Sequence, residues 1–257
     1  MTNFDFLLNL NLFRKGLKIQ QAAVEDFWRQ AGVLLDGSGI ALQPMPRELV
    51  GLGRNFFSVM FIAAFMRLEI PAPRLALYAR INHCLRSWVT ACDNLLDNEL
   101  KETLLTDLPE QAMVFKSVHT LMVADRIFFR FLLDARKQGV IDESEMEQLL
   151  HVSLTALSES GREEAEEEGG VEYDLSPDEV LNRIHRAKTA LLFTAPLAAP
   201  RALGDIRDGD KTLEHIENGL MHFGLACQIV DDLNDLGHDI DVGQQASHIR
   251  LDQRHGA

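Results

Sequence analysis

Apolar residues recur at the 3.6-residue period of an α-helix in nearly every segment of this chain, and the alternation typical of strands is scarce. Residues 75–98 show the pattern clearly, because one stripe is apolar and a second face is polar. That polar face carries His83, Arg86, Thr90, Asp93 and Asp97. A second long apolar helix is predicted over residues 113–136. We therefore predict an all-α fold, with residues 1–257 forming a single domain of about eight to ten helices.

Local signals place the ends of three further helices. Asp142 and Glu145 form a capping box that would open a helix running to about residue 158. Residues 176–179 combine a serine cap, a proline at the first helical position and a glutamate three residues after the cap. The helix that they open would end near Phe193. The last periodic segment spans about residues 212–236.

The formal net charge of −14 argues against some partners. An acidic chain repels nucleic acid and anionic lipid, whereas it could bind an anionic substrate through bridging divalent cations. The three cysteines, Cys84, Cys92 and Cys227, lack CxxC spacing, which is typical of a reduced cytoplasmic protein. The apolar run at residues 56–66 is too short to span a bilayer, and the run at residues 187–199 is interrupted. We expect a soluble, cytoplasmic protein without a signal peptide or membrane segment.

Two Asp-rich motifs are the strongest chemical signal: Asp-Asn-Leu-Leu-Asp at residues 93–97 and Asp-Asp-Leu-Asn-Asp at residues 231–235. In each motif the first and last aspartates are four residues apart, so they would stack on one face of a helix. Carboxylates this close repel each other and require a cation, and Mg²⁺ prefers carboxylate oxygens. Either motif alone is more typical of a solvated acidic face. Both lie in strongly apolar helices, however, where unpaired carboxylates are costly, so we predict that they line one cavity with metals and a diphosphate.

Several motifs together resemble those of the trans-isoprenyl diphosphate synthases, which have the class I isoprenoid synthase fold. Residues 228–235, Gln-Ile-Val-Asp-Asp-Leu-Asn-Asp, match that family's second Asp-rich motif almost residue for residue. Residues 93–97, with His83 upstream, resemble the first. Residues 188–193 resemble the Lys-Thr motif that contacts diphosphate, and residues 124–125 resemble a short motif on the central helix. The resemblance covers roughly residues 45–245.

The resemblance implies a bundle of orthogonal and antiparallel helices around a central cavity, and a homodimer. Three Mg²⁺ ions would bridge both motifs to an allylic diphosphate, held by Asp93, Asp97, Asp231, Asp232 and Asp235. Catalytic roles would belong to Lys188, Thr189 and Gln228, and substrate-binding roles to Arg54, His83, Lys101, Trp88 and Val89. The allylic diphosphate would ionise, and isopentenyl diphosphate would attack the resulting cation. Trp88 and Val89 would limit the enzyme to a short product, although Trp88 is equally typical of a core residue.

The sequence departs from the family's pattern in four places. The basic segment near the N-terminus retains only Arg54, and an aromatic residue replaces the second arginine. After the first motif, Lys101 stands alone where the family has a pair of arginines. Asn94 replaces an aspartate, and the C-terminal helices are expected to be short or missing. Fewer cationic forks weaken bidentate diphosphate recognition, so the second substrate's site looks damaged.

Three functions remain open from the sequence. The leading prediction is a short-chain prenyltransferase that uses two diphosphates. The weak basic motifs also allow a terpene cyclase-like enzyme that ionises one allylic diphosphate, although the intact second motif favours a synthase. The same departures allow a non-catalytic subunit of a prenyl synthase, against which the five retained aspartates argue.

Overall fold

The computed structural model describes residues 3–96, 100–168 and 191–242, and the chain divides into two compact units, Met1–Leu150 and His151–Ala257. Every named element in the described ranges is a helix. β-type pairing in these ranges is limited to an isolated bridge between Leu42 and Thr106. The predicted all-α fold is therefore confirmed, whereas the single domain stays a prediction.

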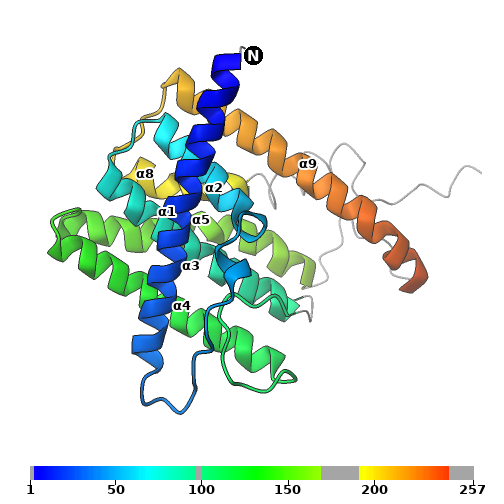
Figure 1. The fold of residues 1–257 in the computed structure, drawn as a ribbon. Helices are drawn as coiled ribbons and strands as arrows, with labels where there is room; N and C mark the ends of the chain where they lie inside the picture. Colours follow the sequence, from blue (N-terminus) through cyan, green and yellow to red (C-terminus); the bar gives the residue numbers. More distant parts are fainter. Residues whose placement is uncertain (1–2, 97–99, 169–190, 243–257) are drawn as a thin grey trace, which may run out of the picture. The chain divides into compact units, whose positions relative to one another are not determined.

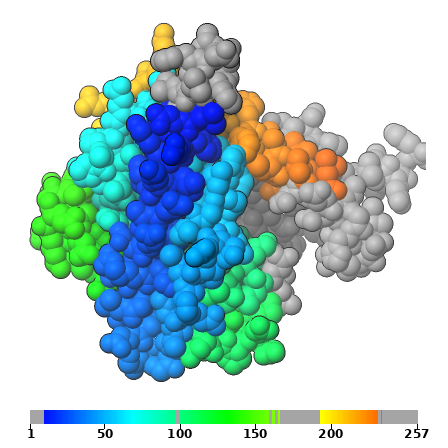
Figure 2. Space-filling view, viewed as in Figure 1, coloured from blue at the N-terminus to red at the C-terminus, as the bar shows by residue number. Residues whose placement is uncertain are grey.

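Four long helices build the first unit: α1 (Asn3–Leu35), α2 (Leu52–Arg67), α3 (Ala72–Leu96) and α4 (Met113–Lys137). A short 3-10 helix, η1 (Arg47–Val50), precedes α2. α3 packs along α4, and α1 contacts α2, α3 and α4 (Figure 1). Figure 2 shows α1, in blue, running down one face of this unit. α1 thus holds the other three helices together.

Large apolar side chains fill the space between these helices. Phe27 from α1, Phe65 from α2 and Tyr78 from α3 are fully buried. Burying each such side chain contributes roughly 1.5–3 kcal/mol to folding. Gly16 lets α1 approach α2 closely, because a Cβ atom there would lie 3.2 Å from the carbonyl oxygen of Val59. The helix pair therefore depends on a residue without a side chain.

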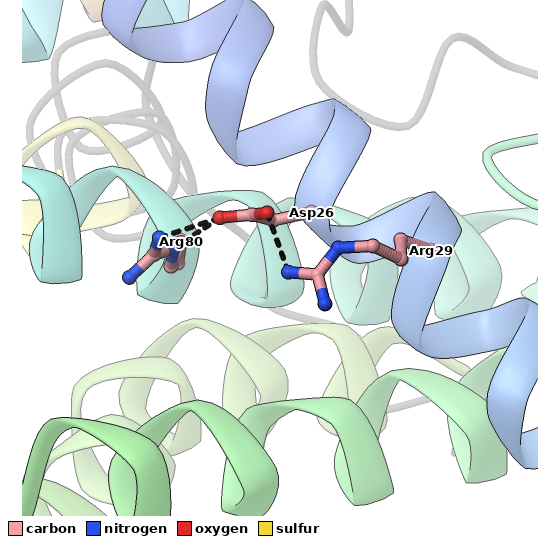
Figure 3. Close-up of polar contacts among 3 residues, drawn as sticks. All are labelled: Asp26, Arg29 and Arg80. Carbon is pink, nitrogen blue, oxygen red and sulfur yellow. Dashed lines mark hydrogen bonds and ion pairs between the residues drawn. The ribbon is translucent and has the colours of Figure 1, made fainter.

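An ion-pair cluster joins α1 to α3 (Figure 3). Arg80 Nε of α3 donates to Asp26 Oδ2 of α1 at 2.9 Å, and Arg29 Nη2 donates to Asp26 Oδ1 at 2.7 Å. Partial burial alone would raise the pKa of Asp26, but the two guanidinium groups outweigh burial and lower it. Arg80 also lies over the ring of Phe131 on α4, 5.6 Å from its centroid.

Two loops at one end of the first unit are joined through their backbones. Gln43 N donates to Leu105 O at 3.0 Å, and Asp107 N donates to Ala41 O at 3.0 Å. Asp107 Oδ1 also accepts a hydrogen bond from Ala41 N at 2.8 Å. The chain that follows α3 is therefore fastened to the chain between α1 and η1.

The capping box before α5 (Glu143–Glu168) forms as predicted. Asp142 N donates to Glu145 Oε2 at 2.9 Å, and Glu145 N donates to Asp142 Oδ1 at 2.8 Å. Glu145 also pairs with Arg74 of α3 at 2.5 Å, which ties the start of α5 to the first unit. α5 continues ten residues beyond the predicted end at about residue 158, because glutamate is a good helix former and its charge run extends the helix.

The second unit contains the last part of α5, the short helices α7 (Leu191–Thr194), η3 (Ala195–Leu197) and α8 (Ala198–Ala202), and the long helix α9 (Lys211–Val242). Phe193 and Phe223 meet edge-on, with ring centroids 5.8 Å apart, and join α7 to α9. Arg201 of α8 pairs with Glu217 of α9. Most of the helix predicted to start at residue 176 lies outside the described residues.

Residues Arg47–Arg67 are apolar enough, with a mean hydropathy of 1.6, and long enough to cross a membrane. Part of the stretch is buried in the first unit, where α2 contacts α1 and α3. A core helix of a soluble protein passes the same test of length and composition. The stretch is therefore weak support for a membrane span.

Candidate functional site

Residues 93–96 of the first Asp-rich motif form the last turn of α3, and two neighbouring residues in this turn lie in different environments. Asp93 is exposed, whereas Asn94 is buried. Asn94 Nδ2 donates to Lys101 O at 3.2 Å, and Lys101 N donates to Asn94 Oδ1 at 2.8 Å. Both polar ends of the Asn94 side chain thus hold the loop that follows α3. Asn94 is a loop anchor rather than a damaged metal ligand.

Two lysines that follow this motif, one in the loop and one on α4, lie in different environments. Lys101, predicted to bind substrate, is exposed. Lys116, on the first turn of α4, is buried, and its Nζ lies 2.9 Å from Glu102 Oε1. Lys116 therefore fastens the loop to α4, whereas the Lys101 side chain is exposed.

The second Asp-rich motif lies within helix α9, so residues 231 and 235 are one helical turn apart on the same face. The side chains of Asp231, Asp232 and Asp235 lie outside the described residues, as do Asp97, Lys188 and Thr189. Gln228 is half-buried on α9. No cluster of three or more metal-ligating side chains occurs among the side chains that the structure describes, and these exclude four of the five predicted ligands.

The predicted donor set fits Mg²⁺. All five residues carry carboxylate oxygens, the ligand type that this hard cation prefers. Asp93 is exposed at the end of α3, and the helical backbone of α9 brings the outer two aspartates of the second motif to one face.

Trp88 and Val89 are half-buried on α3. The ring of Trp88 meets Phe128 of α4 edge-on, with centroids 5.1 Å apart. Trp88 therefore has a packing role between α3 and α4, and its effect on product length stays a prediction.

His83, predicted to contact the second substrate, is almost completely buried. Its ring meets Phe27 edge-on, with centroids 4.8 Å apart, and its Nδ1 has no described hydrogen-bond partner. Burial, followed by the charge of Arg86, lowers the pKa of His83 to about 3. His83 is thus a neutral group within the first unit, one turn from Arg86.

Arg86 belongs to a polar network that joins three helices. Its Nη1 donates to Asn55 Oδ1 at 3.1 Å, and Gln20 Nε2 donates to the same oxygen at 3.2 Å. Asn55 Nδ2 donates to Leu49 O at 2.7 Å and to Gly51 O at 2.8 Å. The sequence places Arg86 on the polar face of α3, but its link to Asn55 on α2 is a tertiary contact that periodicity does not reveal.

An open cavity of about 450 Å³ lies in the second unit. Arg201, Glu217, Asn218 and Met221 are among its lining residues, and Arg201 is already paired with Asp208 and Glu217. No residue that lines this cavity is one of the predicted site residues.

Comparison with known proteins identifies the fold and the family. The chain is similar to the crystal structure of a geranyltransferase from Legionella pneumophila, with a TM-score of 0.58 and 15% identity over 90% of this chain and 80% of that one. A geranyltransferase from Helicobacter pylori matches with a TM-score of 0.49 and 16% identity over 87% of this chain and 80% of that one. No curated protein matches the chain significantly. The family model for polyprenyl synthetase matches residues 111–248, more than half of the chain.

The helical architecture thus defines an isoprenoid synthase fold. The chain belongs to the polyprenyl synthetase family and is a prenyl-transferring enzyme, which confirms the resemblance to trans-isoprenyl diphosphate synthases. The matched residues include Lys188, Thr189 and the second Asp-rich motif, and they begin after the first motif.

Proposed function

We propose that this enzyme is a Mg²⁺-dependent prenyltransferase that ionises an allylic diphosphate and condenses it with isopentenyl diphosphate to a short-chain product. The observation that carries the proposal is the family match over the second Asp-rich motif, together with the helical backbone of that motif in α9. That backbone stacks the carboxylate-bearing positions 231 and 235 one turn apart, an arrangement that calls for a cation.

Different residues of this chain would carry out different parts of the reaction. Asp93, Asp97, Asp231, Asp232 and Asp235 would hold Mg²⁺, which when bound neutralises the diphosphate leaving group. Lys188 would hold diphosphate oxygens, with Thr189 and Gln228 beside it. Trp88 and Val89 would exclude water from the reactive cation and limit chain growth. The homodimer and the cytoplasmic location stay predictions.

A terpene cyclase-like reaction on one allylic diphosphate is the second candidate. Asn94 supports it, because this side chain holds a loop and leaves the first motif with two carboxylates. A non-catalytic subunit of a prenyl synthase is the third candidate, on the same observation.

Product identification separates these functions. The full-length protein would be incubated with Mg²⁺ and dimethylallyl, geranyl or farnesyl diphosphate, with and without isopentenyl diphosphate. Longer diphosphates support the proposal, whereas hydrocarbons or alcohols formed without isopentenyl diphosphate support the cyclase. No turnover alone, with activity restored by a partner synthase, supports the subunit.

Two aspartate variants test the metal role. Asp93→Ala and Asp231→Ala should each lower kcat by about a hundredfold or more, because losing several kcal/mol of charge stabilisation has that effect. The matched control is Asp36→Ala, at an exposed loop position outside both motifs. Full activity of either motif variant, or of the wild-type enzyme in excess EDTA, would refute the metal mechanism.

A further inference from the structure

The negative charge of this chain is not spread evenly over the first unit. Neither α2 nor residues 10–24 of α1 contain an acidic residue, although acidic residues outnumber basic ones in the whole chain by 39 to 25. Four cations on these helices are exposed and form no ion pair with any residue that the structure describes: Arg14, Lys15, Lys18 and Arg67. α1 and α2 therefore present a positive surface in a chain with a net charge of −14.

The same two helices expose apolar side chains. Leu10 on α1 is 51% exposed, and Phe56 and Phe57 on α2 are 39% and 46% exposed. The ring of Phe13 on α1 lies 5.9 Å from that of Phe56, centroid to centroid, and Phe56 lies 5.7 Å from Phe57. The three rings thus form a row that crosses from one helix to the other at the surface of the unit.

α2 is more apolar than its packing in the first unit requires. Phe56, Met60 and Ala63 share one face at helical spacing, yet Phe56 is exposed and the other two are only half-buried. Of the apolar stretch of 18 residues that includes this helix, 39% is buried. A helix that is apolar on all sides normally lies in a core or against lipid. The uncovered face of α2 is therefore suited to an apolar phase.

Cations and apolar groups occur together on one side of α1. Leu10, Arg14 and Lys18 are four residues apart, so they stack along one face of the helix. The neighbouring Phe13 contacts Phe56, which places this side of α1 next to α2. Figure 2 shows α1, in blue, beside the lighter blue start of α2. Exposed basic groups among exposed aromatic and aliphatic ones are typical of helices that lie in a membrane interface.

We propose that α1 and α2 form a peripheral docking surface for an anionic lipid bilayer. Arg14, Lys18 and Arg67 would contact the headgroups, while Leu10 and Phe56 enter the boundary with the acyl chains. The helices would lie on the bilayer and not cross it, because α2 keeps its contacts with α1 and α3. A nucleic acid would also attract the cations, but it offers no hydrocarbon phase for the aliphatic groups.

The surface is separate from the proposed chemistry. It contains none of the residues predicted to bind metal or substrate or to act in catalysis. The inference therefore does not depend on the proposed function, and either can fail without the other. The net charge of the whole chain argues against anionic lipid, so the attraction must come from this local exception.

Co-sedimentation with lipid vesicles tests the surface. The full-length protein should bind phosphatidylcholine vesicles that contain about one-third phosphatidylglycerol, and should bind pure phosphatidylcholine much less. Raising the salt from about 0.1 M to about 1 M should release it, because the Debye length falls from about 10 Å to about 3 Å. Arg14→Gln/Lys18→Gln should lower the partition coefficient by about 25-fold, since each cation near such a surface contributes about fivefold.

A second double variant controls for net charge. Lys137→Gln/Arg207→Gln removes two charges from exposed positions outside α1 and α2, and should bind the vesicles as wild type does. All four side chains are exposed, so thermal unfolding should be unchanged in both variants. No binding by the wild-type protein, or equal loss of binding in the two double variants, would overturn the proposal.

Tryptophan fluorescence tests whether the apolar groups enter the bilayer. The emission of Leu10→Trp should shift to the blue on the anionic vesicles and should be quenched by brominated acyl chains. Val33→Trp, at an exposed apolar position near the other end of α1, should show neither change. Salt-sensitive binding without a shift in Leu10→Trp would indicate charge attraction alone, as to an acidic protein or a nucleic acid, and would overturn the assignment to lipid.

Discussion

The role of a residue within a motif depends on what its side chain contacts in the folded protein. The substitution at position 94 looks like the loss of a metal ligand when the sequence is compared with the family. The structure assigns Asn94 a different task, because its amide group donates to one backbone atom of Lys101 and accepts from another. A carboxylate can accept but cannot donate, so aspartate cannot replace asparagine in this contact.

Restoring the family's aspartate should therefore harm this protein. We expect Asn94→Asp to lower the free energy of unfolding by about 1–3 kcal/mol, because Lys101 O would lose its donor and face a negative charge. Urea unfolding and steady-state kinetics would measure the effect, with the exposed Asn218→Asp as control. A variant as stable as wild type and more active would mean that position 94 serves the metal site.

His83 should make stability sensitive to mild acid. Its pKa of about 3 in the folded protein lies below the usual value near 6.5, so between these values the unfolded chain binds the extra proton. The contribution of the neutral His83 side chain to the free energy of unfolding is fully present above pH 6.5. The free energy of unfolding then falls as the pH drops, by about 2 kcal/mol at pH 5.

Urea unfolding at pH 7.5 and pH 5 would measure this loss. His83→Gln should reduce the difference between the two pH values, whereas His151→Gln, at an exposed position, should not. An equal pH dependence in wild type and His83→Gln would show that other groups cause it.

At the scale of helices, the sequence predicts best what neighbouring residues determine. The capping box at Asp142 and Glu145 and the start of α4 at residue 113 follow from local chemistry and period. The pairing of Arg86 with Asn55 could not be predicted, because it depends on how α2 packs against α3. The anchoring of Asn94 depends likewise on the path of the loop beyond α3.

Close packing of α1 on α2 gives a testable consequence. Gly16→Leu should destabilise the protein by about 1–3 kcal/mol, because the side chain would overlap the backbone of α2 at Val59. Gly219→Leu is the matched change on α9, where a Cβ atom meets nothing within 4 Å. It should stabilise that helix by about 0.5–1 kcal/mol. Thermal unfolding of both variants would check the contrast, and equal effects would exclude a close helix contact at Gly16.

For the whole molecule, the acidic composition is compatible with a diphosphate substrate only where local groups offset the net negative charge. A net charge of −14 opposes a diphosphate ligand at long range. Composition alone therefore argues against anionic substrates, and the sequence points to them only through the aspartate pairs that call for metal. The neighbouring positive charges of Arg54 and Arg86 are a second exception, and their proximity is seen only in the packing of α2 against α3.

The isolated bridge between Leu42 and Thr106 has an evolutionary consequence. Surface loops usually accept insertions and deletions because few contacts constrain their length. These two loops share backbone hydrogen bonds, and one of them also holds the end of the first Asp-rich helix through Asn94. A change of length in the loop after α1 would therefore propagate to the loop beside Asp93, and substitutions in the two loops should be epistatic.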